Sequence, residues 1–427
     1  MRVNRGFYHH ETLPNGIRVL VEDISYVRSV TVGIWVAAGS RFEEARQVGI
    51  THLIEHLLFK GTERRTAREI AESMDAIGGQ LNAFTSKEHT CYYARVLDQH
   101  LQEALDLLSD MLLNSRFDAE DLNREKGVVL EEIKMYEDAP DELVHDLFAG
   151  AIWTNHPLGR NIVGTAPIVS SLERRDILEY FRQHYVPANV VVSIAGNVRE
   201  GTAVDLVSRY LGEMRAVADQ RPAEWGVPPQ ARSGLNIRDK DIEQVHLCLG
   251  TMGVPQDHDD MYPLYVLNNC LGGGPSSRLF QEIRESRGLA YSVYSYLSSY
   301  RDAGLFAIYA GTSPDNSAQV VELTLNEIRR LKREGLTREE LHRAKEQMKG
   351  QLMLSLESTS NRMTRLGRSE LTLGKVYSPD EVIEKVEAVT MEDTVSLAER
   401  LLDGTLTLAA VGPPQKDTGL AEVELKL

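Results

Sequence analysis

Three residues, His52, Glu55 and His56, have the types and spacing of a metal-dependent hydrolytic site. On a helix, histidines four residues apart share a face, and two imidazoles one turn apart can bind a single Zn²⁺. Glu55 lies three residues after His52, at the edge of that face, near enough to act on a metal-bound water. The pattern is the inverted form of the HExxH signature of zinc peptidases. We therefore expect a zinc site; the alternative is a pair of surface histidines on an amphipathic helix.

A catalytic zinc usually takes three protein ligands and a water, so a third ligand should come from elsewhere in the chain. The predicted helix that contains Glu125 and Glu132 offers carboxylates among apolar residues, and these two, seven residues apart, share a face. Glu131 points about 100° away from Glu132 and is expected to face solvent. His145, on an acidic helix, and His156, in a loop before a proline, are rival ligands, although histidines in such places are more often surface residues.

The surrounding pattern predicts the elements that hold these residues. A buried strand over 30–38 precedes a helix over 49–60, whose apolar residues recur at helical spacing. Residues 80–96 are predicted to form two strands, and residues 118–149 a long helical region interrupted at Pro140. The motif is thus expected on a buried helix beside a sheet, where its polar side chains need partners.

His52, Glu55 and His56, with Glu132 on a later helix, resemble the insulinase/pitrilysin zinc metallopeptidases in residue types and in spacing. That family includes the mitochondrial processing peptidase. The resemblance implies that the two histidines and Glu132 bind zinc and that Glu55 is the general base. It also implies that Glu125 supports the site. The resemblance covers the whole chain, because family members contain two homologous domains of about this size joined by an extended linker.

The same resemblance implies a strand that binds substrate. Asn82, Ala83, Phe84 and Thr85 are similar to the edge strand with which the family pairs the extended substrate backbone. Such pairing adds the peptide to the sheet as a further strand, and main-chain hydrogen bonds supply the affinity. The alternative is an ordinary strand with a polar residue near its start.

Arg284 and Tyr291 resemble a pair that the family carries in its non-zinc half, where it contacts the substrate carbonyls and the tetrahedral oxyanion. A cation and a phenol are suitable donors for that charge; the alternative is a helix-end arginine and a strand tyrosine. The second half lacks HxxEH, and its corresponding helix carries Asn268 and Asn269. In four-domain relatives the pair approaches zinc from another domain, which implies here a homodimer with Arg284 and Tyr291 acting in trans. Some relatives divide these elements between two different subunits.

Glu142 and Asp146 lie ten and fourteen residues after Glu132. This spacing resembles the acidic pair with which the mitochondrial processing peptidase holds the arginine two residues before the cut. If a helix resumes after Pro140, the two carboxylates share a face and can hold a guanidinium fork, which lysine cannot reproduce. The alternative is a solvated acidic helix.

The glycine-rich segment 271–279 lacks the residue patterns of phosphate-binding loops. It is either a helix end with a turn, or a shorter form of the substrate loop found in the non-catalytic processing-peptidase subunit.

Repeated segments indicate a duplicated domain. Residues 118–126 resemble 337–345, and residues 192–196 resemble 408–412, at offsets of 219 and 216. Both halves are predicted to contain strand, helix, paired strands, helix and long helix, which favours an α+β fold of two homologous α/β sandwich domains with antiparallel-type sheets covered by helices. The expected boundaries are 1–216 for a catalytic domain, 217–234 for an extended proline-containing linker, and 235–427 for a non-zinc domain.

Composition narrows the functional class. Of 427 residues, 42% are hydrophobic and 26% charged, an ordinary globular balance that argues against wholesale disorder. The net charge of −16 disfavours nucleic acid as a partner and suits peptide substrates with basic residues. Three cysteines without a CxxC pair argue against a disulfide framework. We expect no secretory leader, no membrane span and a cytoplasmic protein, with leaderless export as an alternative.

Together these patterns predict a zinc endopeptidase that hydrolyses unfolded peptides or presequence-like segments inside a closed chamber. The alternatives are a non-catalytic scaffold subunit of the same fold and a peptide-binding module without turnover. Intact His52, Glu55, His56 and Glu132 argue against the scaffold.

Overall fold

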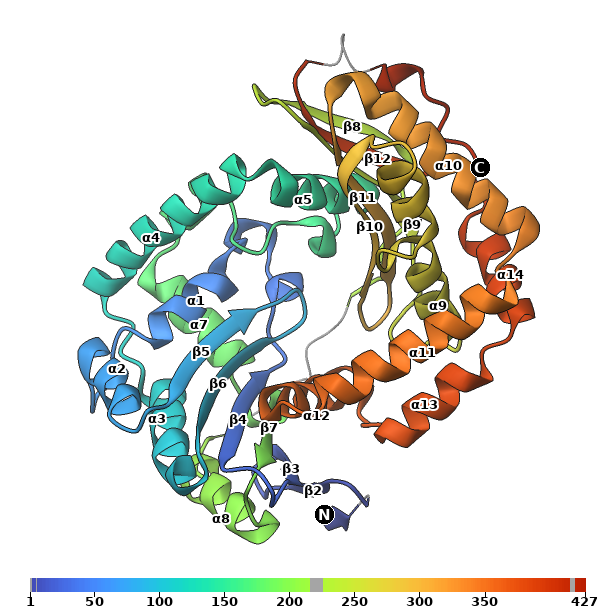
Figure 1. Cartoon of the computed structure of the whole chain (residues 1–427). Coiled ribbons are helices and arrows are strands. Elements are labelled where there is room, and N and C mark those ends of the chain that lie inside the picture. The colour runs from blue at the N-terminus through green and yellow to red at the C-terminus, as the bar shows by residue number, and fades with distance from the viewer. Residues whose placement is uncertain (1, 5, 216–225, 415–418) are drawn as a thin grey trace. The chain divides into compact units, whose positions relative to one another are not determined.

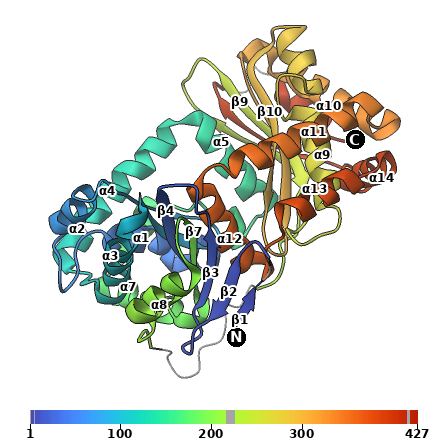
Figure 2. The same ribbon diagram turned by 60° about the horizontal axis from the view of Figure 1, so that its bottom comes forward.

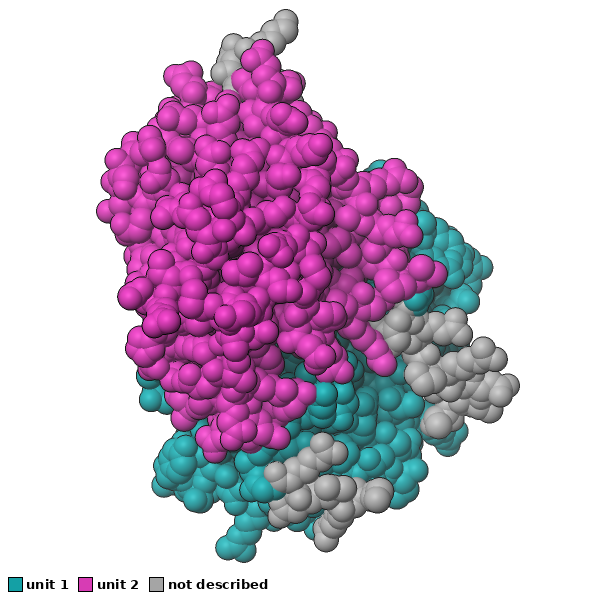
Figure 3. Space-filling model, turned by 90° about the vertical axis from the view of Figure 1, so that its right-hand side faces the viewer, with its two compact units in different colours: residues 1–134, 160–226, 354–376 teal, residues 135–159, 227–353, 377–427 magenta. Residues whose placement is uncertain are grey.

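The chain forms two compact units, each built on one β-sheet. A computed structural model describes residues 2–4, 6–215, 226–414 and 419–427. The units are coloured separately in Figure 3, and their helices and strands are labelled in Figure 1. Unit 1 comprises Met1–Lys134, Arg160–Gly226 and Leu354–Val376; unit 2 comprises Met135–Gly159, Val227–Met353 and Tyr377–Leu427.

The sheet of unit 1 has seven strands in the order β1-β2-β3-β7-β4-β6-β5. All neighbours are antiparallel except β3 and β7, which are parallel. Figure 2 shows the edge of this sheet that the N-terminal strands form, where β2 lies between β1 and β3. At the opposite edge lies β5, which follows the segment that contains His52, Glu55 and His56. The strands span Arg2–Asn4 (β1), His9–Thr12 (β2), Arg18–Asp23 (β3), Ser29–Val36 (β4), Gln80–Thr85 (β5), Thr90–Leu97 (β6) and Val190–Gly196 (β7).

Both faces of this sheet are covered, which explains why β4 and β7 are almost continuously apolar. One face, with Val32 and Ile34, belongs to a buried cluster with α1, α3, α7 and α8. The other face, with Leu20 and Trp35, packs against α12. The helices of this unit span Ile50–Leu58 (α1), Ala67–Asp75 (α2), Leu101–Asn114 (α3), Ala166–Ser171 (α6), Arg174–His184 (α7), Glu200–Leu211 (α8) and Thr359–Leu373 (α12), and Ala119–Asp138 (α4) begins in it.

The approach of α12 to the sheet is close. The indole Nε1 of Trp35 donates a hydrogen bond to Ser193 Oγ at 2.8 Å, and that hydroxyl donates to the carbonyl of Met363 at 2.9 Å. A Cβ at Gly367 would lie 2.1 Å from the Trp35 indole, so only glycine fits this contact.

The sheet of unit 2 has five strands in the order β10-β11-β9-β12-β8, all antiparallel except the parallel pair β8 and β12. One face packs against α9, α10 and α14, and the other against α5. The strands span Gly234–Asp239 (β8), Val245–Met252 (β9), Ala290–Ser299 (β10), Gly304–Thr312 (β11) and Thr407–Gly412 (β12). The helices span Pro140–Ile152 (α5), Met261–Gly272 (α9), Ser317–Glu334 (α10), Arg338–Ser355 (α11), Pro379–Ala388 (α13) and Met391–Leu401 (α14).

The predicted fold class is confirmed. The order β8-β12-β9-β11-β10 repeats the order β3-β7-β4-β6-β5, including the position of the one parallel pair. The sheets are therefore mixed rather than purely antiparallel. Unit 1 adds β1 and β2 beyond the repeated strands.

The packing units differ from the duplicated halves at two helices. At the repeat offset of 219, α5 and α12 are equivalent, because 140 + 219 = 359. Yet α5 belongs to unit 2, and α12 belongs to unit 1. The expected boundaries 1–216 and 235–427 follow the duplication and not this grouping. Of the expected linker 217–234, residues 217–225 lie outside the described residues, and 226–233 form no helix or strand.

Among the described residues, we find no helix that combines the length and the apolar character needed to cross a bilayer.

Candidate metal centre

The histidine motif lies on α1, a helix held by its apolar side. Ile50, Leu53, Ile54 and Leu57 are buried in the same cluster as the inner residues of the sheet. The remaining face of α1 carries the motif's polar side chains. The sheet thus fixes the orientation of the helix, and the helix fixes the direction of its two imidazoles.

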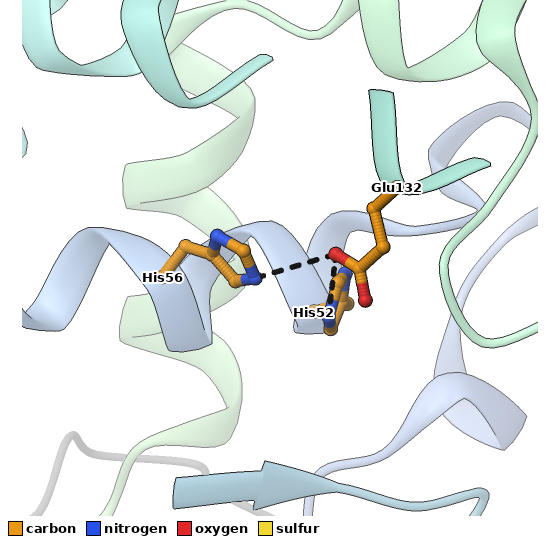
Figure 4. Close-up of side chains that lie close together, drawn as sticks. All are labelled: His52, His56 and Glu132. Atoms are coloured by element: carbon orange, nitrogen blue, oxygen red, sulfur yellow. Dashed lines mark ion pairs between the residues drawn. The ribbon is translucent and has the colours of Figure 1, made fainter. Parts of the chain in front are cut away.

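Three side chains from two helices converge (Figure 4). The Oε2 atom of Glu132 lies 3.6 Å from His52 Nε2 and 3.7 Å from His56 Nε2. Ligand atoms about 2.1 Å from a tetrahedral Zn²⁺ are roughly 3.4 Å apart, so these separations suit one ion. Among the described residues this is the one group of three or more His, Cys, Asp or Glu that could hold a metal. Two imidazoles and a carboxylate are the donor set of a catalytic zinc that keeps a position open.

The protonation of this group also favours a metal. Burial lowers the pKa of His52 to about 4, so its imidazole is neutral at pH 7 and its lone pair is available. Glu125, 2% exposed, lies with Oε2 at 3.3 Å from His56 Nδ1, and Lys60 Nζ lies 2.9 Å from its other oxygen. A carboxylate at Nδ1 accepts a hydrogen bond from the Nδ1–H group, which keeps the ring proton on Nδ1 and leaves Nε2 unprotonated for a metal.

Glu55 stands beside the ligand group without joining it. The hydroxyl of Thr85, the last residue of β5, donates a hydrogen bond to Glu55 Oε2. Burial raises the pKa of the Glu55 carboxyl, whereas this hydrogen bond and His56 lower it. A partly buried carboxylate with a raised pKa can accept and release a proton near neutral pH.

The strand β5 lies at the edge of its sheet and pairs only with β6 among the described strands. Its residues Asn82, Ala83, Phe84 and Thr85 are exposed or half-buried. The backbone N–H of Ala83 donates to Asn82 Oδ1 at 2.8 Å. The Phe84 ring packs edge-on against Trp35, with the ring centroids 5.6 Å apart.

The residues Arg284 and Tyr291 lie together in unit 2. The Arg284 guanidinium is 4.8 Å from the centroid of the Tyr291 ring, and the tyrosine is 80% exposed. Arg284 lies on a short π-helical turn, η6 (Phe280–Glu285), and Tyr291 is the second residue of β10. The structure thus brings together two residues seven positions apart in the sequence.

Tyr291 also lines a pocket of about 300 Å³ that contains Glu142. Asp141 is the second carboxylate in its wall; Asp146 is not among the lining residues. His145, a rival ligand by sequence, lies outside the candidate ligand group and forms part of this wall, with Nδ1 at 2.8 Å from Tyr296 Oη. The complete lining is Asp141, Glu142, His145, Gln244, His246, Tyr291, Ser292, Tyr294, Tyr309 and Gly311.

The other residues considered from the sequence lie elsewhere. Glu131 is 71% exposed and pairs with Lys134 at 2.6 Å. Nε2 of His156 lies 3.1 Å from the carbonyl of Val227. In the glycine-rich segment, α9 ends at Gly272 and the following N–H bonds back to the carbonyl of Asn269, a helix end and turn.

Sequence patterns missed three contributors to these sites: Lys60 beside Glu125, Asp141 in the pocket, and the bond from Thr85 to Glu55. Only Asp141 carried a local signal, as the neighbour of Glu142. The others are contacts between segments far apart in the sequence, which helical spacing cannot reveal.

Known proteins resemble the chain over most of its length. The model described as insulinase (peptidase family M16) matches residues 18–166, and the model described as the peptidase M16 inactive domain matches residues 171–348. YmxG of Bacillus subtilis, called an uncharacterized zinc protease, is 50% identical over 347 residues, 81% of this chain and 84% of that protein. An uncharacterized zinc protease of Streptomyces coelicolor is 44% identical over 359 residues, 82% of this chain and 78% of that protein.

Solved structures share the fold. A protease from Helicobacter pylori superimposes with a TM-score of 0.89 at 22% identity, covering 95% of this chain and 99% of that one. A peptidase M16 inactive domain from Pseudomonas fluorescens gives 0.88 at 20% identity, covering 96% and 98%. The family predicted from the motif and its spacing is confirmed by the family models and by the identity to the zinc proteases. The chain belongs to the insulinase family, peptidase family M16.

Proposed function

We propose that the chain is a zinc endopeptidase that cleaves extended, unfolded peptides. The observation that carries the proposal is the convergence of His52 Nε2, His56 Nε2 and Glu132 Oε2, with Glu55 beside them and outside the ligand set. A scaffold or a peptide-binding module of this fold would not need a general base next to three metal ligands. The zinc proteases among the relatives support the same activity.

The roles of the residues follow from their positions. Zn²⁺ held by His52, His56 and Glu132 would supply a Lewis acid that makes water nucleophilic near neutral pH. Glu55 takes the proton of the attacking water and passes it to the leaving amine, which its raised pKa permits. The Thr85 hydroxyl holds the Glu55 carboxylate at the end of β5.

The free edge of β5 is the proposed substrate platform. An extended peptide can add to this edge as a further strand, so that its backbone runs past Glu55. The Asn82 side chain, which now accepts the N–H of Ala83, would give way to a substrate carbonyl. An unfolded segment offers the continuous, unpaired backbone that such pairing requires.

Arg284 and Tyr291 are the proposed donors to the substrate carbonyls and the developing oxyanion. We propose that they act in trans, in a homodimer that encloses the substrate in a chamber. The exposure of Tyr291 and the cation against its ring leave the phenol available to a second molecule.

The pocket beside Tyr291 is the proposed site for a substrate arginine. Its wall combines the carboxylates of Asp141 and Glu142 with the rings of Tyr294 and Tyr309. Carboxylates pair with a guanidinium in a planar fork, and aromatic faces attract it. The acidic pair predicted from spacing was Glu142 with Asp146; in the structure the second carboxylate of the pocket belongs to Asp141.

One experiment tests the central proposal. Zinc content is measured in the purified protein, and cleavage of a quenched fluorescent peptide is followed before and after treatment with a chelator. We expect about one zinc per chain, and cleavage that stops with the chelator and returns with Zn²⁺. Peptide binding without cleavage in the zinc-loaded protein would indicate a binding module, and absence of zinc would indicate a scaffold.

A further inference from the structure

Glu43, a buried carboxylate outside the proposed ligand group, holds the first turn of α1, the helix that carries His52 and His56. Glu43, 3% exposed, accepts hydrogen bonds from the backbone N–H groups of Gly49 and Thr51, both at 2.9 Å. The N-cap residue of α1 is Gly49, which has no side chain for this role. A carboxylate at a helix N-terminus accepts hydrogen bonds from backbone N–H groups that otherwise lack a partner, and its negative charge interacts favourably with the helix dipole.

This first turn leads directly to a ligand. His52 follows Thr51, whose hydroxyl donates to Tyr180 Oη at 2.9 Å. Gly49 has φ of 97°, and a Cβ there would lie 2.8 Å from the carbonyl oxygen of Val163. Glu43 therefore holds the turn through its backbone N–H groups, and Tyr180 holds it through the side chain of Thr51. At the start of the turn, Gly49 packs closely against Val163.

The segment that ends at Glu43 also contacts the loop that follows β5. The N–H of Arg41 donates to the carbonyl of Lys87 at 2.7 Å, and its guanidinium forms a buried ion pair with Glu88 at 2.8 Å. Residues 86–89 connect β5 to β6. One short segment thus contacts both the loop that follows the proposed substrate strand and the first turn of α1.

We propose that Glu43 is a positioning residue of the metal site, which sets His52 and Glu55 relative to β5. The proposal rests on the proposed zinc peptidase function. Glu43 is not one of the three proposed ligands; it acts by fixing the first turn of α1. Its two oxygens each accept one N–H, so an amide in its place loses one of the two bonds.

The groups that face Glu43 define how its charge responds to pH. Burial raises the pKa of Glu43 to about 7, while the N–H groups of Gly49 and Thr51, the Thr51 side chain and the Lys87 ammonium favour its charged form. The Tyr180 phenol also lies near, and the Arg160 guanidinium bonds to the Glu43 main-chain carbonyl. Because the pKa of Glu43 is raised from 4.5 to about 7, its contribution to folding stability is fully present below pH 4.5. This contribution is lost as the pH rises through about 7.

The test compares Glu43→Gln with two matched variants. Glu44→Gln makes the same change one residue away, on an exposed side chain paired with Arg46, and Glu69→Gln removes a capping carboxylate from α2. Zinc affinity is measured by competition with a chelator, together with kcat, KM and the Tm of the metal-free protein at pH 8.

For Glu43→Gln we expect zinc to bind about tenfold more weakly and kcat to fall about tenfold, with KM within twofold. Its Tm should stay near that of wild type at pH 8, because the amide removes a buried charge. The loss of zinc affinity should shrink below pH 7, where protonated Glu43 resembles the amide. Glu44→Gln should match wild type, and Glu69→Gln should lower only Tm.

Two results would overturn the inference: wild-type zinc affinity and kcat in Glu43→Gln, or a fall in Tm that alone accounts for the lost activity. If Glu43→Gln does not fold, Glu43→Asp keeps the charge with a shorter reach, and wild-type zinc affinity in that variant would also refute the role. Failure of the proposed function is distinguishable, because wild-type protein would then not cleave peptide, whereas the zinc measurement needs no cleavage.

Discussion

The helices α1 and α9 follow equivalent strands of the two sheets, β4 and β9, but they differ in the side chains that they carry. His52 lies 16 residues after Val36, the last residue of β4. Asn268 likewise lies 16 residues after Met252, the last residue of β9. By the same count, His56 corresponds to Gly272. A Cβ at Gly272 would lie 2.2 Å from the backbone nitrogen of Ser295 on β10.

In unit 2, therefore, close packing occupies the position that corresponds to the candidate metal centre of unit 1. Strand β10 approaches α9 so closely that no side chain fits at Gly272, whereas in unit 1 the same position carries an imidazole beside Glu132. Strand β10 has ten residues and carries the exposed Tyr291 near its start, whereas β5 has six residues and ends at Thr85, beside Glu55. One fold therefore supports two sets of side chains, and the function depends on those sets and not on the fold.

The largest effect should come from removing the one residue that gives α1 its proposed acid–base role. Glu55→Gln should lower kcat by about 10²–10⁴-fold while the protein keeps its zinc, since Glu55 is outside the ligand group. Peptide cleavage and zinc content are measured on the same sample. His52→Ala is the control and should lose zinc; equal zinc loss in both variants would contradict the general-base role.

The next largest effect is expected on α4, where it distinguishes Glu132, a proposed metal ligand, from its sequence neighbour Glu131. Glu132→Gln should weaken zinc binding by more than the roughly 10–100-fold typical of a residue that only orients a ligand. Glu131→Gln should leave zinc affinity unchanged, because Glu131 is exposed and pairs with Lys134. Chelator competition compares the two, and equal zinc affinities would refute the assignment of Glu132.

The contribution of unit 2 should be smaller. Tyr291→Phe is expected to lower kcat by about 10²-fold with zinc retained, the effect of losing one donor to an oxyanion. Arg284→Ala should act on the same step.

Subunit exchange then tests action in trans. In a heterodimer of Glu55→Gln and Tyr291→Phe chains, trans action puts both lesions in one site and leaves the other intact. Activity should rise when the two impaired proteins are mixed. No recovery, with exchange verified by mass spectrometry, would show that the pair acts in cis.

The smallest effect concerns arginine preference. Peptides with Arg, Lys or Ala before the scissile bond should be cleaved in that order by wild-type protein. Glu142→Gln should reduce the preference for Arg about tenfold, corresponding to about 1.4 kcal/mol from one hydrogen bond to a charge. Asp146→Asn is the control, because Asp146 does not line the pocket. Equal cleavage of all three peptides would refute the proposal that this pocket binds a substrate arginine.

Much of the candidate metal centre was predictable, because the sequence signals for its residues are local. Helical spacing placed His52 and His56 on one face and separated Glu131 from Glu132, and repeated segments revealed the duplication. The second carboxylate of the pocket was not predictable, since the side of α5 that faces the pocket depends on how the helix packs against its sheet. The links from Glu43 to Thr51 and from Lys60 to Glu125 join separate segments, and no periodicity encodes them.

The placement of α12 in unit 1 has a consequence during synthesis of the protein. Strand β7 is complete at Gly196, and α12 begins only at Thr359. At about 5–20 residues per second, a ribosome needs roughly 8–30 s to make the intervening stretch. Throughout this interval the face of the sheet with Leu20 and Trp35 lacks its cover, and it is exposed to chaperones or to other nascent chains. Conversely, α5 leaves the ribosome before any strand of its own sheet exists. The chain must therefore be nearly finished before either unit can close.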